Sequence, residues 1–141
     1  MKILALDLGG RWIGSAISDE LGITCRPYET VKREALNSFL NKVLLEEKIG
    51  TVIVGHPKTL MGRESIQTQK IAEEKIELEQ KFNMIDGIPI KWILWDERLS
   101  SKRAETTLGK KYKEKQGKLE SHSIAAAFIL QTYLDYVASN R

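Results

Sequence analysis

The chain has 141 residues, of which 42% are hydrophobic and 29% charged, and its formal net charge at pH 7 is +3. This composition excludes an intrinsically disordered chain, and we expect residues 1–141 to form one globular domain. The single cysteine, Cys25, excludes an intramolecular disulfide and a cysteine zinc cluster. No apolar run reaches the roughly 18 residues that cross a bilayer, and the N-terminus does not have the pattern of a signal peptide. We therefore expect a cytoplasmic protein without a membrane partner.

The first 31 residues predict three strands. Residues 2–8 are a short apolar run that ends in Asp-Leu-Gly-Gly, a pattern typical of a buried strand followed by a turn. Residues 12–18 are rich in small and β-branched side chains and predict the second strand. Residues 23–31 predict a third, which Pro27 favours at a sheet edge because proline cannot donate to a neighbouring strand. The short connections favour an antiparallel meander.

The apolar period then changes from strand-like to helical. Residues 34–48 carry apolar side chains at helical spacing and predict a helix. Residues 51–54 are a brief β-branched run that predicts a buried strand, and His56 and Lys58 are expected in the loop after it. Residues 65–82 predict a long charged helix with a narrow apolar stripe, and residues 88–95 predict another strand.

The last third of the chain predicts helices and one loop. Ser100 can cap a short helix that ends near residue 108. Residues 109–118 lack apolar periodicity and predict a mobile loop, and residues 121–137 predict an amphipathic helix. The whole order predicts an α/β fold with a mixed five-stranded sheet, an antiparallel meander plus parallel strands, and helices on its faces. The ends of the first, fourth and fifth strands then meet at one edge, where open α/β sheets bind ligands.

Acidic residues follow two of these strands. Asp7 ends the first, and the two glycines after it would let a metal ion or a phosphate approach closely, although an aspartate that begins a turn has the same pattern. Asp96, Glu97 and Arg98 follow the last strand. Period-two alternation makes Asp96 and Glu97 face opposite ways, so that one can face Asp7 while the other caps the next helix. Arg98 has the fork of donors that binds phosphate, although a solvated charge cluster is also common here.

The last helix adds two candidates. His122 shares a face with Ala126 and Ile129 and is expected to point toward the sheet, where a lone histidine is often structural. Glu120 lies two residues earlier, about 200° away around a helix. Both can face one site only if Glu120 precedes the helix. Alternatively, Glu120 is a carboxylate that the helix dipole favours at the helix start.

Basic residues concentrate in one segment. The segment from Arg98 to Lys118 contains eight basic and two acidic residues, so its net charge is +6 and that of the rest of the chain is −3. Such asymmetry is expected where phosphates dock, although a solvated lysine-rich loop has the same composition. The candidate phosphate-binding residues are Arg98, Lys110, Lys111, Lys113 and Lys115.

Four segments together resemble the YqgF family, whose members are regarded as pre-16S rRNA nucleases and were formerly regarded as Holliday junction resolvases. The most specific of these segments is the Asp-Glu-Arg-Leu-Ser run at 96–100. The segments occur in the family's order and span nearly the whole chain, at residues 7–14, 54–57 with 61–62, 95–101 and 123–131.

The resemblance implies a ribonuclease H-like fold and a site of three acidic residues. Two of these fall on Asp7 and Glu97, but the third, at the start of the last helix, falls on His122; Gly10 also replaces a usual threonine. Mg²⁺ prefers oxygen ligands, whereas Mn²⁺ accepts imidazole more readily. The resemblance therefore implies Mg²⁺ or Mn²⁺, with Mn²⁺ favoured if His122 is a ligand. Alternatively, Glu120 is the third carboxylate, or cleavage has been lost.

The function implied is a metal-dependent phosphodiester hydrolase, a nuclease acting on structured nucleic acid. Bound ions would generate a metal-bound hydroxide, orient the scissile phosphate and stabilise the leaving 3′ oxygen. The substrate implied is an rRNA precursor, cut in the 5′ maturation of pre-16S rRNA during ribosome biogenesis, with ribosomal particles as further partners. The alternatives are a Holliday junction resolvase acting on branched DNA, which needs two sites and so a dimer, and a nucleic-acid-binding module that does not cut. A monomer or a weak homodimer is expected.

Overall fold

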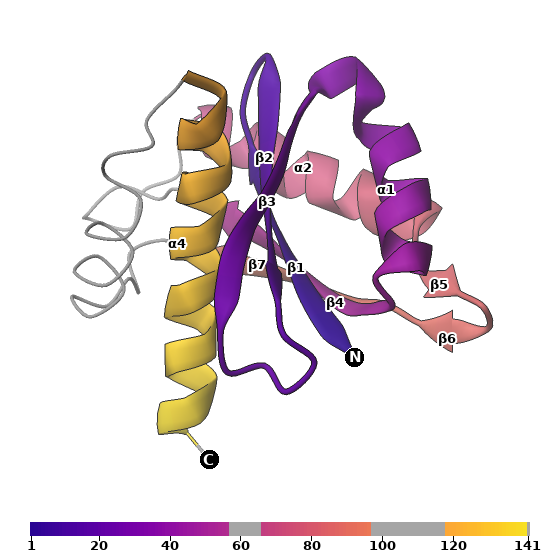
Figure 1. The fold of residues 1–141 in the computed structure, drawn as a ribbon. Helices are drawn as coiled ribbons and strands as arrows, with labels where there is room; N and C mark the ends of the chain where they lie inside the picture. Colours follow the sequence, from indigo (N-terminus) through magenta and orange to yellow (C-terminus); the bar gives the residue numbers. More distant parts are fainter. Residues whose placement is uncertain (57–65, 97–117, 141) are drawn as a thin grey trace.

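The computed structural model describes residues 1–56, 66–96 and 118–140, and Figure 1 shows their arrangement. None of the helices in these ranges is long and apolar enough to cross a bilayer. In chain order the elements are β1 (Lys2–Leu8), β2 (Trp12–Ser18), β3 (Cys25–Lys32), the 3-10 helix η1 (Arg33–Ala35), α1 (Leu36–Glu46), β4 (Ile49–His56), α2 (Ile66–Lys81), β5 (Met84–Ile85), β6 (Ile88–Pro89), β7 (Lys91–Asp96) and α4 (Lys118–Ser139).

Five strands form one mixed sheet in the order β3-β2-β1-β4-β7. β1, β2 and β3 pair antiparallel, whereas β4 pairs parallel with both β1 and β7. This arrangement confirms the predicted meander followed by parallel strands. Pro27 lies in β3 at the edge of the sheet, also as predicted, because an edge strand has one side on which a donor is not needed.

The sheet lies between two helical layers, with α1 and α2 on one face and α4 on the other (Figure 1). Successive side chains of β1 alternate between them. Leu4, Leu6 and Leu8 pack in the cluster that contains α1 and α2, whereas Ala5 packs in the cluster that contains α4. The same alternation decides which polar residues at the strand ends face which layer.

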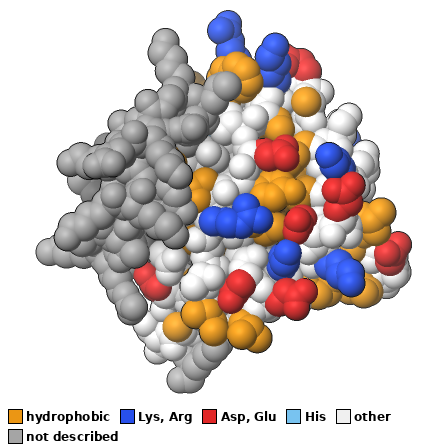
Figure 2. Space-filling view, viewed as in Figure 1, with side chains coloured by type: hydrophobic (Ala, Val, Ile, Leu, Met, Phe, Trp, Pro, Cys, Tyr) orange, Lys and Arg blue, Asp and Glu red, His pale blue; other side chains and the backbone are white. Residues whose placement is uncertain are grey.

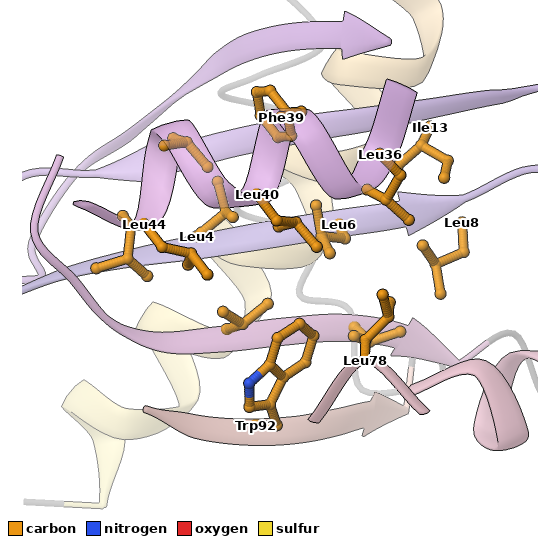
Figure 3. Packing of buried hydrophobic residues seen from close by; sticks show 14 of the residues in the cluster. Leu4, Leu6, Leu8, Ile13, Leu36, Phe39, Leu40, Leu44, Leu78 and Trp92 are labelled. Carbon is orange, nitrogen blue, oxygen red and sulfur yellow. The ribbon is translucent and has the colours of Figure 1, made fainter. Parts of the chain in front are cut away.

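Large aliphatic side chains fill the layer under α1. Leu36, Leu40 and Leu44 recur every four residues, so they form one stripe that points at the leucines of β1 (Figure 3). Leu40 is fully buried. No side chain caps the first turn of α1, so burial of this stripe, rather than capping, holds the helix in place.

Small side chains line the opposite layer. Ala126 of α4 is fully buried against Ala5 of β1 and Ala16 of β2. Alanine adds little thickness between backbones, so α4 lies close to the sheet. Farther along the helix, the indole Nε1 of Trp95 in β7 donates to Thr132 Oγ1 at 2.8 Å, which ties α4 to the edge strand.

The predicted strand at 88–95 is wrong at its start. Ile88–Pro89 forms β6, which pairs with β5 in a separate two-stranded hairpin, and β7 begins only at Lys91. The hairpin turns at Asp86 and Gly87, both of which have positive φ, 48° and 77°. An Asp-Gly pair is a strong hairpin signal because both residues tolerate this conformation.

Other boundaries shift by smaller amounts. β4 extends to His56, which was expected in a loop but is the buried last residue of the strand. α4 begins at Lys118 rather than near Ser121. The predicted short helix at 100–108 and the predicted loop up to residue 117 lie outside the described residues.

A substitution at Gly14 of β2 tests how closely α4 approaches the sheet. A Cβ added there would lie 2.0 Å from the backbone oxygen of His122 and 2.7 Å from the backbone nitrogen of Ser123. We expect Gly14→Ala to destabilise the fold by about 1–3 kcal/mol in urea unfolding, because a backbone cannot rotate away as a side chain can. Gly10→Ala is the matched control, since nothing lies within 4 Å of its Cβ position. Equal stability of the two variants would show that α4 does not sit this close to β2.

Candidate active site at the carboxyl edge of the sheet

The carboxyl ends of β1, β4 and β7 meet at one edge of the sheet, as the sequence predicted. The last residue of β4, His56, lies beside the last residue of β7, Asp96, and Leu6 of β1 pairs with Val54 of β4. Asp7 is the next residue of β1. This edge therefore brings polar residues from three strands into one region, where open α/β sheets bind ligands.

Asp7 faces the α4 layer. It lies between Leu6 and Leu8, which face α1 and α2, so alternation turns its carboxylate to the other side. In the antiparallel register Asp7 pairs with Gly14, the residue against which α4 packs. Asp7 is half-buried there.

His122 lies against the same two strands. Its backbone oxygen approaches Gly14, and its ring atom Cε1 lies 3.7 Å from where a Cβ of Gly9 would be. Gly9 follows Asp7 by two residues, so these glycines leave room for the imidazole next to the carboxylate. The charges of Asp7 and His122 are close enough to interact. The structure thus brings these two predicted site residues together.

Burial dominates the electrostatics of Asp7. Desolvation raises the pKa of its carboxyl above the ordinary value, and the charge of His122 opposes that rise. A raised carboxyl pKa in a polar edge region is common at functional sites. A divalent cation bound there would favour the ionised form and remove the cost of burying the negative charge.

Asp96 lies on the other face of the sheet from Asp7. Trp95 packs in the α4 cluster and Leu94 beside the α1 and α2 cluster, so Asp96 faces α2. His56 shares that face, and its ring Nε2 lies 3.1 Å from the backbone oxygen of Thr68 in α2. A carbonyl only accepts, so Nε2 donates this hydrogen bond. His56 therefore anchors α2 to the end of β4.

The remaining predicted site residues are not placed by the structure. Glu97 and Arg98 lie outside the described residues, as do Lys110, Lys111, Lys113 and Lys115. On the face shown in Figure 2, acidic and basic side chains of the described residues are interspersed. The predicted phosphate-binding segment thus stays a prediction.

The start of α4 bears on Glu120. Because α4 begins at Lys118, the backbone at Glu120 is already helical, and residues two apart on a helix point about 200° away from each other. The condition under which Glu120 and His122 could face one site, that Glu120 precede the helix, is not met. The structure describes the backbone of Glu120 but not its side chain.

Among the described residues, no group of three or more His, Cys, Asp and Glu side chains could hold a metal ion. Asp7 and His122 supply one carboxylate and one imidazole, a donor pair that suits Mn²⁺ better than Mg²⁺. They fit part of a metal site, and any further protein ligand would come from outside the described residues.

Two residues that position this edge were not predicted as such. Gly14 had a sequence signal, because a glycine inside a strand often marks close approach of another backbone. Arg33 had none, because its side-chain hydrogen bonds are with residues 23 and more positions away.

A carboxyl titration followed by NMR in metal-free protein tests the environment of Asp7. We expect its pKa above the ordinary aspartate value in the wild type, and higher still in His122→Gln, which removes the opposing charge. Asp19 is an internal control: hydrogen bonds from the amides of Ile23 and Thr24 lower its pKa, and His122→Gln should leave it unchanged. An Asp7 pKa that falls in His122→Gln would contradict this arrangement.

The same shift makes a prediction for stability. The folded-state pKa of Asp7 is raised, so its contribution to stability is fully present below the unfolded-state pKa and is lost as pH rises through the folded-state pKa. At neutral pH and without metal, Asp7→Asn should therefore be more stable than the wild type in urea unfolding. A less stable Asp7→Asn would mean that the ionised carboxylate is already compensated in the metal-free protein.

Comparison with known proteins identifies the family. The family model described as RuvX, Holliday junction resolvase, matches residues 1–136. A protein of Caldicellulosiruptor saccharolyticus is 38% identical over 99% of this chain and 100% of its own length, and one of a Sulfurihydrogenibium species is 39% identical over 95% and 90%. Both carry the name "Putative pre-16S rRNA nuclease".

Solved structures show the fold. Thermus thermophilus RuvC is 14% identical, covers 99% of this chain and 97% of its own, and superimposes with a TM-score of 0.64. The fowlpox virus Holliday junction resolvase gives 0.57 at 15% identity, over 96% and 99% of the two chains. The predicted ribonuclease H-like fold and the resemblance to the YqgF family are confirmed, and the chain belongs to the RuvX family, also called YqgF, with a RuvC-like structure.

Proposed function

We propose that this protein is a metal-dependent nuclease that hydrolyses phosphodiester bonds in structured nucleic acid, with Asp7 at the centre of its site. The observation that carries the proposal is the half-buried Asp7 carboxylate beside His122 at the carboxyl edge of a RuvC-like sheet. Burial of a charged carboxylate is costly unless a nearby cation compensates the charge or the group takes up a proton. A site that binds a divalent cation explains why an acid stands there.

The substrate we propose is the precursor of 16S rRNA, cut in its 5′ maturation during ribosome biogenesis. Support comes from relatives of 32–39% identity that carry this substrate in their names and align over nearly their whole lengths. Ribosomal particles would then be further partners, and the reaction would take place in the cytoplasm.

Three side chains are proposed to hold the metal: Asp7, Glu97 and His122. Asp96 faces α2, and the sequence expectation that Asp96 and Glu97 face opposite ways then favours Glu97 as the ligand. Glu120 is the alternative third ligand, disfavoured because α4 begins before it. With an imidazole in the set we expect Mn²⁺ to support activity better than Mg²⁺. When bound, the divalent ion supplies an activated water and stabilises charge on the phosphate.

The protein's own groups complete the site. The Asp7 carboxylate is held in place by β1 and by the packing of α4, so it does not have to be ordered when the substrate arrives. Arg98, Lys110, Lys111, Lys113 and Lys115 are proposed to bind flanking phosphates without reading sequence. Their side chains would place the strand to be cut over the Asp7 edge.

Cleavage of a labelled pre-16S RNA in Mg²⁺ and in Mn²⁺ tests the proposal. We expect the wild type to cut better in Mn²⁺, and Asp7→Asn to lose more than about 100-fold in rate, beyond the loss expected for an outer-shell partner. Asp19→Asn is the matched control, since it makes the same change in a turn at the opposite end of the sheet. His122→Asp should shift the preference toward Mg²⁺, because it restores a third carboxylate.

Two further variants assign the third ligand. If His122 is a ligand, His122→Gln lowers Mn²⁺-dependent cutting and Glu120→Gln does not; the reverse result would favour Glu120. Should the wild type bind the RNA but cut in neither metal, while His122→Asp cuts, the third ligand has been lost. Binding without cutting by every variant would overturn the nuclease and leave a nucleic-acid-binding module.

A second candidate is a Holliday junction resolvase, favoured by the description of the matching family model. The same Asp7 site would then cut four-way DNA junctions, and paired cuts need two sites in a dimer. Cleavage of a synthetic junction in the same buffers, with the mass of the protein measured at assay concentration, separates the candidates. A dimer that cuts the junction faster than the RNA would favour the resolvase.

A further inference from the structure

The turn that follows Asp7 accepts three hydrogen bonds from Arg33, a residue from another part of the chain. Residues 9–11 join β1 to β2, and their three successive carbonyl oxygens all accept hydrogen bonds from Arg33 in η1. Arg33 Nη2 donates to Gly9 O at 2.5 Å and Arg33 Nε to Gly10 O at 3.1 Å. The backbone N–H of Arg33 donates to Arg11 O at 3.0 Å.

The guanidinium is itself held from α2. Its Nη1 forms an ion pair with Glu74 Oε2, so one planar group joins the turn to α2, which lies on the other face of the sheet from α4. α2 is fixed in turn by Ile71 and Leu78 in the core and by the His56 hydrogen bond to Thr68. Because the donors of a guanidinium are arranged rigidly, Glu74 fixes where the other donors point.

The position of this turn decides the geometry next to Asp7. The amide of Gly9 donates to the carbonyl of Asp7 at 3.1 Å, so the turn begins on Asp7 itself. A Cβ at Gly9 would lie 2.4 Å from Trp12 O and 3.7 Å from the His122 ring. With so little free space, displacement of the turn would change the placement of both Asp7 and His122.

We propose that Arg33, oriented by Glu74, is a positioning residue for the Asp7 site, a role that rests on the nuclease function proposed above. Arg33 acts through the turn rather than on the substrate. The pattern of its contacts supports this, because each of the three guanidinium nitrogens donates one hydrogen bond, two of them to carbonyls of the turn and one to Glu74.

Three variants and one control test the proposal. Arg33→Lys keeps the charge but loses the fork, Arg33→Gln loses both, and Glu74→Gln removes the ion pair while keeping the shape. Lys75→Gln is the matched control, since it breaks the Lys75–Glu79 ion pair on the same helix and leaves the Arg33–Glu74 pair intact. Each is measured for urea stability, hydrogen exchange of the amides of residues 9–12, Mn²⁺ binding by calorimetry, and kcat and KM for the labelled RNA.

We expect Arg33→Lys and Arg33→Gln to speed exchange in residues 9–12 by about tenfold, the effect of losing about one net hydrogen bond. Mn²⁺ affinity and kcat should fall by about 10–100-fold, as for other partners that orient a metal ligand, with KM nearly unchanged. Glu74→Gln should act in the same direction but less, and Lys75→Gln should match the wild type in all four measurements.

Other outcomes overturn the proposal. Unchanged exchange in residues 9–12 in both Arg33 variants would show that Arg33 does not hold the turn. Wild-type kcat in Arg33→Lys with a raised KM in Arg33→Gln would make Arg33 a phosphate contact that acts by charge. If the wild type cuts no substrate, the nuclease proposal fails on its own, while exchange and Mn²⁺ binding still decide whether Arg33 positions Asp7.

Discussion

The close approach of α4 to β2 at Gly14 is the contact on which the candidate site depends. A side chain at this position would overlap the backbone of His122, so only glycine lets the helix start lie over the sheet. Gly14 is also the partner of Asp7 across the antiparallel register. One small residue therefore brings a carboxylate from β1 and an imidazole from α4 into one place, although 115 positions separate them in the numbering.

The two helical layers contribute to this edge in different ways. On the α4 side, small residues such as Ala5 and Ala126 keep the helix near the sheet, and this brings His122 to Asp7. On the other side, large apolar side chains of α1 and α2 pack against the sheet. There Arg33, whose backbone bonds to the turn after β1, joins that turn to α2 through its ion pair with Glu74. The Asp7 site is thus positioned from both faces.

Asp7 shows how stability and function are opposed at this site. Its burial raises the pKa of the carboxyl, which means that the metal-free fold is less stable with the group ionised. Strand residues elsewhere in β1 carry no such cost, since Leu4 and Leu6 are apolar and fully buried. A carboxylate kept at a position where the fold disfavours its charge is typical of a residue retained for binding or chemistry.

The sequence by itself determined what depends on neighbouring residues: the period-two strands, the meander, the edge at which Asp7 lies, and the face of His122. It did not determine the contacts of Arg33 or the burial of the His56 side chain, because these arise where segments far apart in the chain pack together. The β5–β6 hairpin was missed although Asp86-Gly87 signalled it, and the roles of Glu97, Arg98 and the lysines stay predictions. Local periodicity is set by backbone geometry, whereas only the tertiary structure decides which backbone approaches Gly14 and which carbonyls Arg33 can reach.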